Sequence, residues 1–218
     1  MPVEVYAGDE QAAHSIDLTR WVKLVEDVFS AEGIVYDAEV NVLFVDEPSI
    51  AELNQRFMGH EGSTDVLSFP IDEDPPESGR HPDAGGTGPG DPSDPDDMPM
   101  LLGDIVVCPE VAARNAPDHA DDRHDGSFDD EVALLLVHGI LHLLGMDHED
   151  NDEAEEMEAR ERAHLARAYK PPPDGTPAPP LEPRTRTGPV LPPRSSDSIT
   201  LEQLSRGELP SHRSDDED

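Results

Sequence analysis

Short apolar or alternating runs, bounded by glycine, proline and acidic residues, recur along the first half of the chain. Runs of roughly four to eight residues that are rich in valine, leucine and phenylalanine predict β-strands. Strands are therefore expected over residues 3–6, 40–45, 64–70 and 101–108. The last two are joined by one long connection, so we expect them to pair as a hairpin.

Other stretches place apolar residues three and four positions apart, the spacing that puts them on one face of a helix. Asp17 can cap the first of these stretches, and Asp46 followed by Pro48 can start the second. Ser127 with Asp130 resembles a capping box for the most apolar one. Helices are expected from Asp17 to Gly33, from Asp46 to about Phe57, over 109–116, from Ser127 to Gly145 and over 151–169.

Two segments lack the apolar content that a packed core requires. Residues 72–99 are dominated by proline, glycine and aspartate, and residues 171–218 contain 11 prolines. Such segments bury too little surface to offset the entropy of ordering. We therefore expect a flexible acidic insert over 72–99 and a disordered Pro-rich tail over 169–218. Residues 1–168 are expected to form one domain.

The charge balance narrows the set of partners. The chain has 50 acidic against 15 basic residues, a formal net charge of −35, and the acidity is spread along its length. Such a chain repels DNA and anionic membranes unless its basic residues cluster. Cys108 is the only cysteine, which fits a reducing compartment, and no apolar run has the length that spans a membrane. We expect a soluble, cytoplasmic protein that binds neither DNA nor a membrane.

Three histidines stand in H-x3-H-x5-H spacing at the end of the most apolar helix: His138, His142 and His148. Residues four apart share a helix face, so the first two can present imidazole nitrogens to one ion. Gly145 can adopt the left-handed conformation that ends a helix, and the following turn can return His148 to the other two. Three imidazoles with an open fourth position are the ligand set of a catalytic zinc site. The alternative is that His138 and His142 are ordinary polar residues of an amphipathic helix.

Gly139 separates this pattern from that of the zinc peptidases. Their H-E-x-x-H motif carries a glutamate general base after the first histidine, where this chain has Gly139. The missing base argues against peptide hydrolysis. Because glycine inside a helix costs about 1 kcal/mol relative to alanine, we expect close packing at this position or room beside the metal.

The segment His138-Gly139-x-Leu141-His142-Leu143-x-Gly145-x-Asp147-His148 resembles the motif of the YbeY family of bacterial endoribonucleases. Two upstream blocks agree: Leu53-Asn54-x-x-Phe57 followed by Thr64 to Pro70, and Leu102-Gly103-Asp104-Ile105. The likeness covers roughly residues 1–168. It implies an α+β fold, with a small mixed β-sheet flanked by helices and the metal site at the end of a central helix.

The same resemblance implies a function. It implies one zinc ion per chain, held by His138, His142 and His148, and endonucleolytic cleavage of single-stranded rRNA. It also implies a role in maturing the 3′ end of small-subunit rRNA and in ribosome quality control. The ribosomal small subunit and its assembly factors would then be partners.

One position departs from the family pattern. Many relatives carry an arginine, thought to take part in catalysis, where this chain has Met58. Arg56 lies two residues earlier and would point elsewhere on a helix. Arg20, Arg56 and Arg114 are the cations that could converge in space to serve the phosphate instead.

Asp147 and Asp65 are the candidate proton carriers for phosphodiester cleavage. Zinc could polarise a phosphoryl oxygen, or it could lower the pKa of its bound water to about 7 and so supply a hydroxide nucleophile. Alternatively, the RNA 2′-OH could attack the phosphorus in place of water. Each aspartate also has a structural explanation, because Asp147 can orient a ligand histidine and Asp65 can cap the entry to a strand. Four other histidines lack ligand spacing and are expected to be exposed to solvent: His60, His119, His124 and His164.

Two other functions stay open at this point. The low lysine content favours a ribosome-assembly factor whose zinc is structural and whose nuclease activity is weak or absent. The histidine spacing alone also allows a zinc hydrolase that acts on peptides or small molecules, which Gly139 disfavours.

Overall fold

The computed structural model describes residues 3–34, 38–71, 100–121, 124–146, 148, 151–171 and 175–181. The expected insert over 72–99 and most of the expected tail, residues 182–218, lie outside the described residues. The proposed division into a domain and a tail therefore stays a prediction. Side-chain contacts of the domain continue to Lys170, whose Nζ lies 3.1 Å from Asp130 Oδ2.

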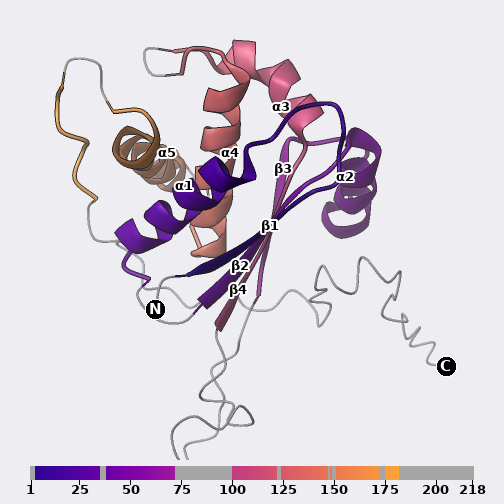
Figure 1. The fold of residues 1–218 in the computed structure, drawn as a ribbon, viewed down its shortest axis with the longest axis horizontal. Helices are drawn as coiled ribbons and strands as arrows, with labels where there is room; N and C mark the ends of the chain where they lie inside the picture. The colour runs from indigo at the N-terminus through magenta and orange to yellow at the C-terminus, as the bar shows by residue number, and fades with distance from the viewer. Residues whose placement is uncertain are drawn as a thin grey trace, which may run out of the picture.

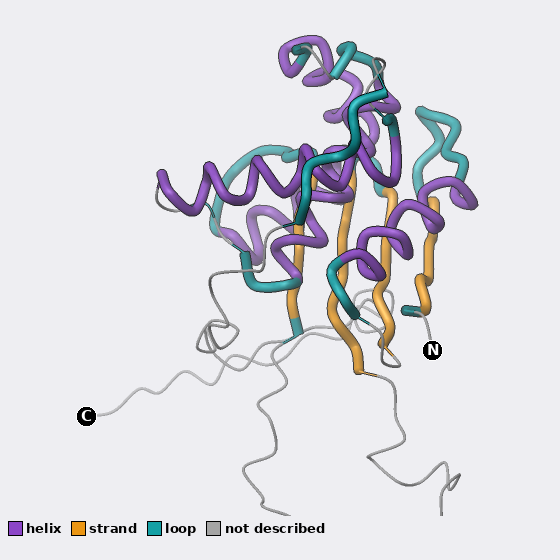
Figure 2. The backbone as a smooth tube through the Cα atoms, turned by 90° about the vertical axis from the view of Figure 1, so that its left-hand side faces the viewer, coloured by secondary structure: helices purple, strands orange, loops and turns teal. Residues whose placement is uncertain are grey.

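A four-stranded mixed sheet forms the centre of the fold, with the strand order β1-β2-β4-β3. The strands are β1 (Glu4–Asp9), β2 (Ala38–Phe44), β3 (Val66–Pro70) and β4 (Met100–Val107). β1 and β4 both run parallel to β2, and β3 pairs antiparallel with β4. Figure 2 shows the strands side by side. The expected hairpin between the last two strands is confirmed.

The helices agree closely with the expected ones. They are α1 (Leu18–Ala31), α2 (Glu47–Leu53), α3 (Pro109–Asn115), α4 (Phe128–Leu143) and α5 (Asn151–His164). Short π-helical turns, η1 (Asn54–Met58) and η4 (Leu165–Tyr169), extend α2 and α5, and the 3-10 turn η3 (Ala116–His119) follows α3. None of the described helices is both long and apolar enough to cross a membrane. The α+β expectation is confirmed.

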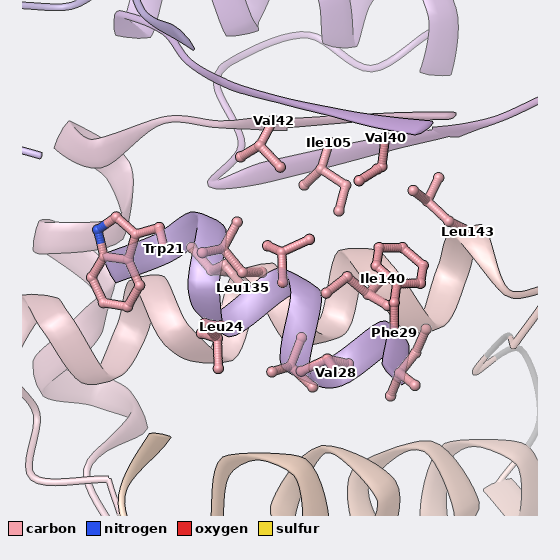
Figure 3. Packing of buried hydrophobic residues seen from close by; sticks show 14 of the residues in the cluster. Trp21, Leu24, Val28, Phe29, Val40, Val42, Ile105, Leu135, Ile140 and Leu143 are labelled. Carbon is pink, nitrogen blue, oxygen red and sulfur yellow. The ribbon is translucent and has the colours of Figure 1, made fainter. Parts of the chain in front are cut away.

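α4 is the central helix, because it contacts β3 and β4 on one side and α1 and α5 on others (Figure 1). The side chains of α1 and α4 fill the main core against one face of the sheet, as Figure 3 shows for Trp21 and Phe29 of α1 and for Ile140 of α4. This enclosure explains why α4 is apolar around most of its circumference rather than along one stripe. It also fixes the end of α4 that carries the histidines.

Gly103 allows β4 to pass close to both β3 and α4. The pairing of β2 with β4 shifts by one residue between Glu39 and Val40, and Gly103 follows this bulge with a φ of +139°. A Cβ placed at Gly103 would lie 2.3 Å from the Phe69 carbonyl oxygen and 2.9 Å from Leu143 Cδ2. Neither the backbone conformation nor the space suits a side chain.

Gly103→Ala is expected to lower the free energy of unfolding by roughly 2–4 kcal/mol, because backbone strain and overpacking act together. Urea denaturation measures the change. The matched control is Gly33→Ala, which also sits at a positive φ, of +81°, but whose Cβ would meet nothing within 4 Å. The control should lose only about 1–2 kcal/mol. Equal losses for the two variants would contradict the packing argument.

The opposite face of the sheet is covered in part by α2, where Ile50 packs with Leu67 and Val106. Asp104 points to this face and is buried, and Asn41 Nδ2 donates a hydrogen bond to its Oδ1 over 2.6 Å. Burial raises the pKa of Asp104, although the Asn41 hydrogen bond acts to lower it. The folded chain therefore holds the ionised form of this carboxyl less readily than the unfolded chain does.

Asp104→Asn is expected to raise the melting temperature near neutral pH, since the amide keeps an oxygen for Asn41 and carries no charge to bury. The raised pKa means that ionisation costs stability as pH rises through the titration of the carboxyl. The advantage of the variant should therefore disappear as pH falls below the pKa of an unfolded aspartate, about 3.9. Thermal melts of both proteins across this pH range measure it, and a gain that persists in acid would contradict the ionisation argument.

Candidate metal centre

Both ends of α4 have the caps that the sequence predicts. Ser127 Oγ accepts a hydrogen bond from Asp130 N over 3.2 Å at the start of the helix. At the other end Gly145 has a φ of +79°, and the amides of Gly145 and Met146 donate to the carbonyls of His142 and Leu141. This pair of bonds is the Schellman motif. It reverses the chain directly after His142 and brings the following residues back toward the helix.

The turn brings the three predicted ligands together. One nitrogen from each of His138, His142 and His148 lies within 4.8 Å of the others. His138 Nε2 and His142 Nε2 are 3.0 Å apart, and the ring centroid of His148 lies 5.5 Å and 5.1 Å from those of His138 and His142. His148 is exposed and the other two are half-buried. Two ligands therefore come from one helix face, a third comes from the turn, and the cluster opens to solvent.

Each of the two helical histidines is held in place through Nδ1, the ring nitrogen that faces away from the cluster. His138 Nδ1 lies 2.8 Å from Glu161 Oε1 on α5, and His142 Nδ1 lies 3.0 Å from the carbonyl oxygen of Met146. An ionised carboxylate and a carbonyl are acceptors only, so the Nδ1 atoms donate and the Nε2 lone pairs face the centre of the cluster. This donor set fits a divalent ion such as zinc. Glu161 was not among the residues that the sequence analysis singled out.

Gly139 is explained by packing of α4 on the sheet. A Cβ at this position would lie 2.9 Å from Ile105 Cγ2 and 3.0 Å from Ser68 Oγ. The expected close contact is therefore confirmed. A glutamate in place of Gly139 would run into β3 and β4, so the general base of the zinc peptidases has no place here.

Comparison with known proteins agrees with this geometry. Residues 6–169, most of the chain, match the family model for endoribonuclease YbeY. The chain belongs to the endoribonuclease YbeY family. Endoribonuclease YbeY of Frankia casuarinae is 40% identical over 153 residues, which are 70% of this chain and 68% of that protein. That of Salinispora tropica is 40% identical over 166 residues, or 76% of this chain and 95% of that protein.

A solution structure of a Thermotoga maritima protein is also similar, with 26% sequence identity and a TM-score of 0.45. The similar region covers 75% of this chain and 87% of the Thermotoga maritima chain. YbeY proteins are metal-dependent endoribonucleases, so this chain is an enzyme of that class with a candidate metal site at His138, His142 and His148.

Of the two candidate proton carriers, Asp65 is among the described residues of this YbeY chain. Asp147 lies outside the described residues. Asp65 precedes β3, where its Oδ1 accepts a hydrogen bond from Val66 N over 2.9 Å and its Oδ2 accepts one from Asn115 Nδ2 over 3.1 Å. These bonds are those of a residue that shapes the entry to a strand, and its catalytic role stays a prediction.

The residue at which the sequence departs from the expected family motif lies at the end of the π-helical turn after α2. Met58 is the last residue of that turn and its side chain is exposed, while Gly59 follows with a φ of +71°. Arg56 instead lies over the ring of Phe57, with its Cζ 5.3 Å from the ring centroid. The side chain at position 58 is thus an exposed, uncharged thioether.

The other two arginines considered for phosphate binding are engaged in ion pairs. Arg114 Nη2 lies 2.9 Å from Glu47 Oε1 on α2, and Arg20 Nη1 lies 2.5 Å from Asp129 Oδ2 in the first turn of α4. Asp129 precedes His138 by nine positions on the same helix, about 14 Å at the usual rise per residue. Arg20, one of the cations that could have converged to serve the phosphate, is therefore paired near the end of α4 opposite the histidines.

Of the four other histidines expected to be exposed, His60 and His119 are exposed, whereas His124 and His164 are buried. His164 Nε2 lies 2.6 Å from Glu32 Oε1. His124 Nε2 lies 3.1 Å from Glu131 Oε2 without reaching hydrogen-bond geometry. The expectation of exposure was wrong for these two, because the side chain of each lies against a fully buried carboxylate. For His164 that carboxylate, on Glu32, is more than a hundred positions away in the sequence.

Proposed function

We propose that this YbeY-family chain is a zinc-dependent endoribonuclease specific for single-stranded RNA. We further propose that it matures the 3′ end of small-subunit rRNA and serves ribosome quality control. The observation that supports this best is a cluster of three imidazoles, within 4.8 Å of one another, in which one ring is exposed. Catalytic zinc sites have this combination of three protein ligands and an open side, whereas structural sites are closed by four.

Zinc is the proposed ion because the donors that the described residues bring together are three imidazoles. When bound, zinc supplies a Lewis acid that stabilises the charge developing on a phosphoryl oxygen. The chain holds the ligands in place through Glu161 and the Met146 carbonyl. Asp147 and Asp65 are the proposed proton carriers, and attack by water or by the RNA 2′-OH fits the site equally well.

The charge of the chain supports presentation of the RNA by the ribosome. The net charge is −35, and Arg20 and Arg114 already pair with carboxylates. Phosphate affinity comes mainly from free lysine and arginine side chains. We therefore propose that, in the cytoplasm, the small subunit and its assembly factors bring rRNA to the site.

The full chain, purified without added metal, tests the proposal. Metal analysis is expected to find about one zinc per chain, as for a single three-ligand site. Unstructured RNA should be cut and the same sequence in a duplex should not. A chelator should stop cleavage, and zinc added back should restore it.

Three outcomes separate the alternatives. Zinc-loaded protein that cuts no RNA, yet restores processed rRNA in a strain lacking its YbeY, would favour a ribosome-assembly factor. Cleavage of a peptide library without RNA cleavage would favour a zinc hydrolase of peptides. Protein that retains full RNase activity after exhaustive chelation would contradict a metal-dependent mechanism.

A further inference from the structure

We propose that Glu161 is a positioning residue that sets the orientation and proton of His138, an inference that rests on the metal site proposed above. Glu161 is on α5, far from His138 in sequence, and its Oε1 lies 2.8 Å from His138 Nδ1. Its side chain is only 12% exposed. Water therefore competes poorly for this contact, and the carboxylate has a defined partner.

The chemistry of the contact selects one form of the ring. A neutral imidazole carries its proton on one nitrogen and a lone pair on the other, and a carboxylate at Nδ1 requires the proton there. The lone pair is then on Nε2, which lies 3.0 Å from His142 Nε2 and faces the cluster. A negative partner also makes the imidazole a stronger ligand than a neutral acceptor would.

Glu161 is held in turn by the attachment of α5 to α1. The neighbouring Arg160 places Nε 2.5 Å from Glu32 Oε1 and Nη2 2.8 Å from Glu32 Oε2. His164 Nε2 reaches the same Glu32 Oε1 over 2.6 Å. Both Glu32 and His164 have fully buried side chains. This clamp, made of Glu32, Arg160 and His164, leaves α5 little freedom to slide along α4.

Beside the buried Ala163, the inward side of α5 includes Met157, Arg160, Glu161 and His164. These positions follow the i, i+3, i+4, i+7 spacing of a buried helix stripe. A helix that only covered the core would need apolar residues at them. Three of the four are polar, and each of the three contacts a specific group: Arg160 and His164 bind Glu32, and Glu161 binds His138. The face is built for positioning as well as for packing.

Zinc affinity tests the proposal directly. The full-length wild type and the variants Glu161→Gln and Glu161→Ala are titrated against a chromophoric zinc chelator. Loss of an outer-shell partner typically weakens metal binding about 10–100-fold. We expect Glu161→Gln near the lower end of that range, because the amide oxygen can still accept from Nδ1, and Glu161→Ala near the upper end. The cobalt-substituted variants should also show shifted visible absorption bands.

Glu158→Gln is the matched control, since Glu158 lies on the same helix with an exposed side chain. Its Oε2 lies 3.3 Å from Nη1 of Arg162, which is also exposed. It should bind zinc like the wild type. Melting of the metal-free proteins shows whether Glu161→Gln is folded. Wild-type zinc affinity in folded Glu161→Gln and Glu161→Ala would overturn the positioning role while leaving the metal site intact. Failure of the wild type to bind zinc would instead overturn the proposed function.

Discussion

Replacing His142 with alanine is expected to remove the bound zinc and to reduce RNA cleavage to the level of the chelated wild type. His142 lies beside both other predicted ligands, with its Nε2 3.0 Å from that of His138 and its ring centroid 5.1 Å from that of His148. Two remaining imidazoles do not make a catalytic zinc site, which requires three protein ligands. Zinc content should fall from about one per chain to near zero, measured together with the cleavage rate on unstructured RNA.

His14→Ala is the control for this variant. His14 stacks on Phe128 at the start of α4, with ring centroids 4.8 Å apart. Phe128 precedes His142 by 14 positions, which is about 21 Å along the helix. This variant should keep both zinc and activity. Tight zinc binding by folded His142→Ala would contradict the ligand assignment, and loss of zinc in His14→Ala would mean that the assay reports general destabilisation.

The cluster of three histidines could be predicted from the sequence because its geometry is local. The spacing of His138 and His142 places both on one helix face, and Gly145 ends the helix by a backbone rule that needs no distant contact. The strands and most helix limits were predictable for the same reason, since periodicity and capping are properties of short segments. The hairpin of β3 and β4 required only that two neighbouring strands pair.

The surroundings of the cluster could not be predicted in this way. The inward side of α5 combines apolar residues, Met157 and Ala163, with ionic groups, so apolar periodicity alone does not mark it. His164 looks like one of many polar residues in a charged helix. Its burial depends on Glu32, more than a hundred positions away. The one available signal was the helical spacing of Met157, Arg160, Glu161 and His164. The strong acidity of the segment hid that signal, because charge usually marks an exposed face.

Glu32→Gln is expected to have the largest effect on stability, about 3–5 kcal/mol of unfolding free energy, because it leaves a buried arginine without its counter-charge. The Arg160 side chain is 10% exposed and that of Glu32 is fully buried. Burial alone would raise the pKa of Glu32, but hydrogen bonds from His164 and Arg160 outweigh it and lower the pKa from 4.5 to about 2. Urea denaturation at neutral pH measures the loss.

The lowered pKa also fixes the direction of the pH dependence. A carboxylate that is more acidic in the folded chain stabilises it fully above the unfolded pKa and loses that contribution as pH falls through the folded one. The difference between wild type and Glu32→Gln should therefore be constant above about pH 5 and shrink toward pH 2. Glu47→Gln is the control, since the pKa of Glu47 is also lowered to about 2, by Arg114, but in an exposed pair. Because solvent screens the Glu47–Arg114 pair, Glu47→Gln should lose much less unfolding free energy than Glu32→Gln at every pH. Equal losses of unfolding free energy in the two variants would show that burial does not determine how much the Glu32 clamp stabilises the fold.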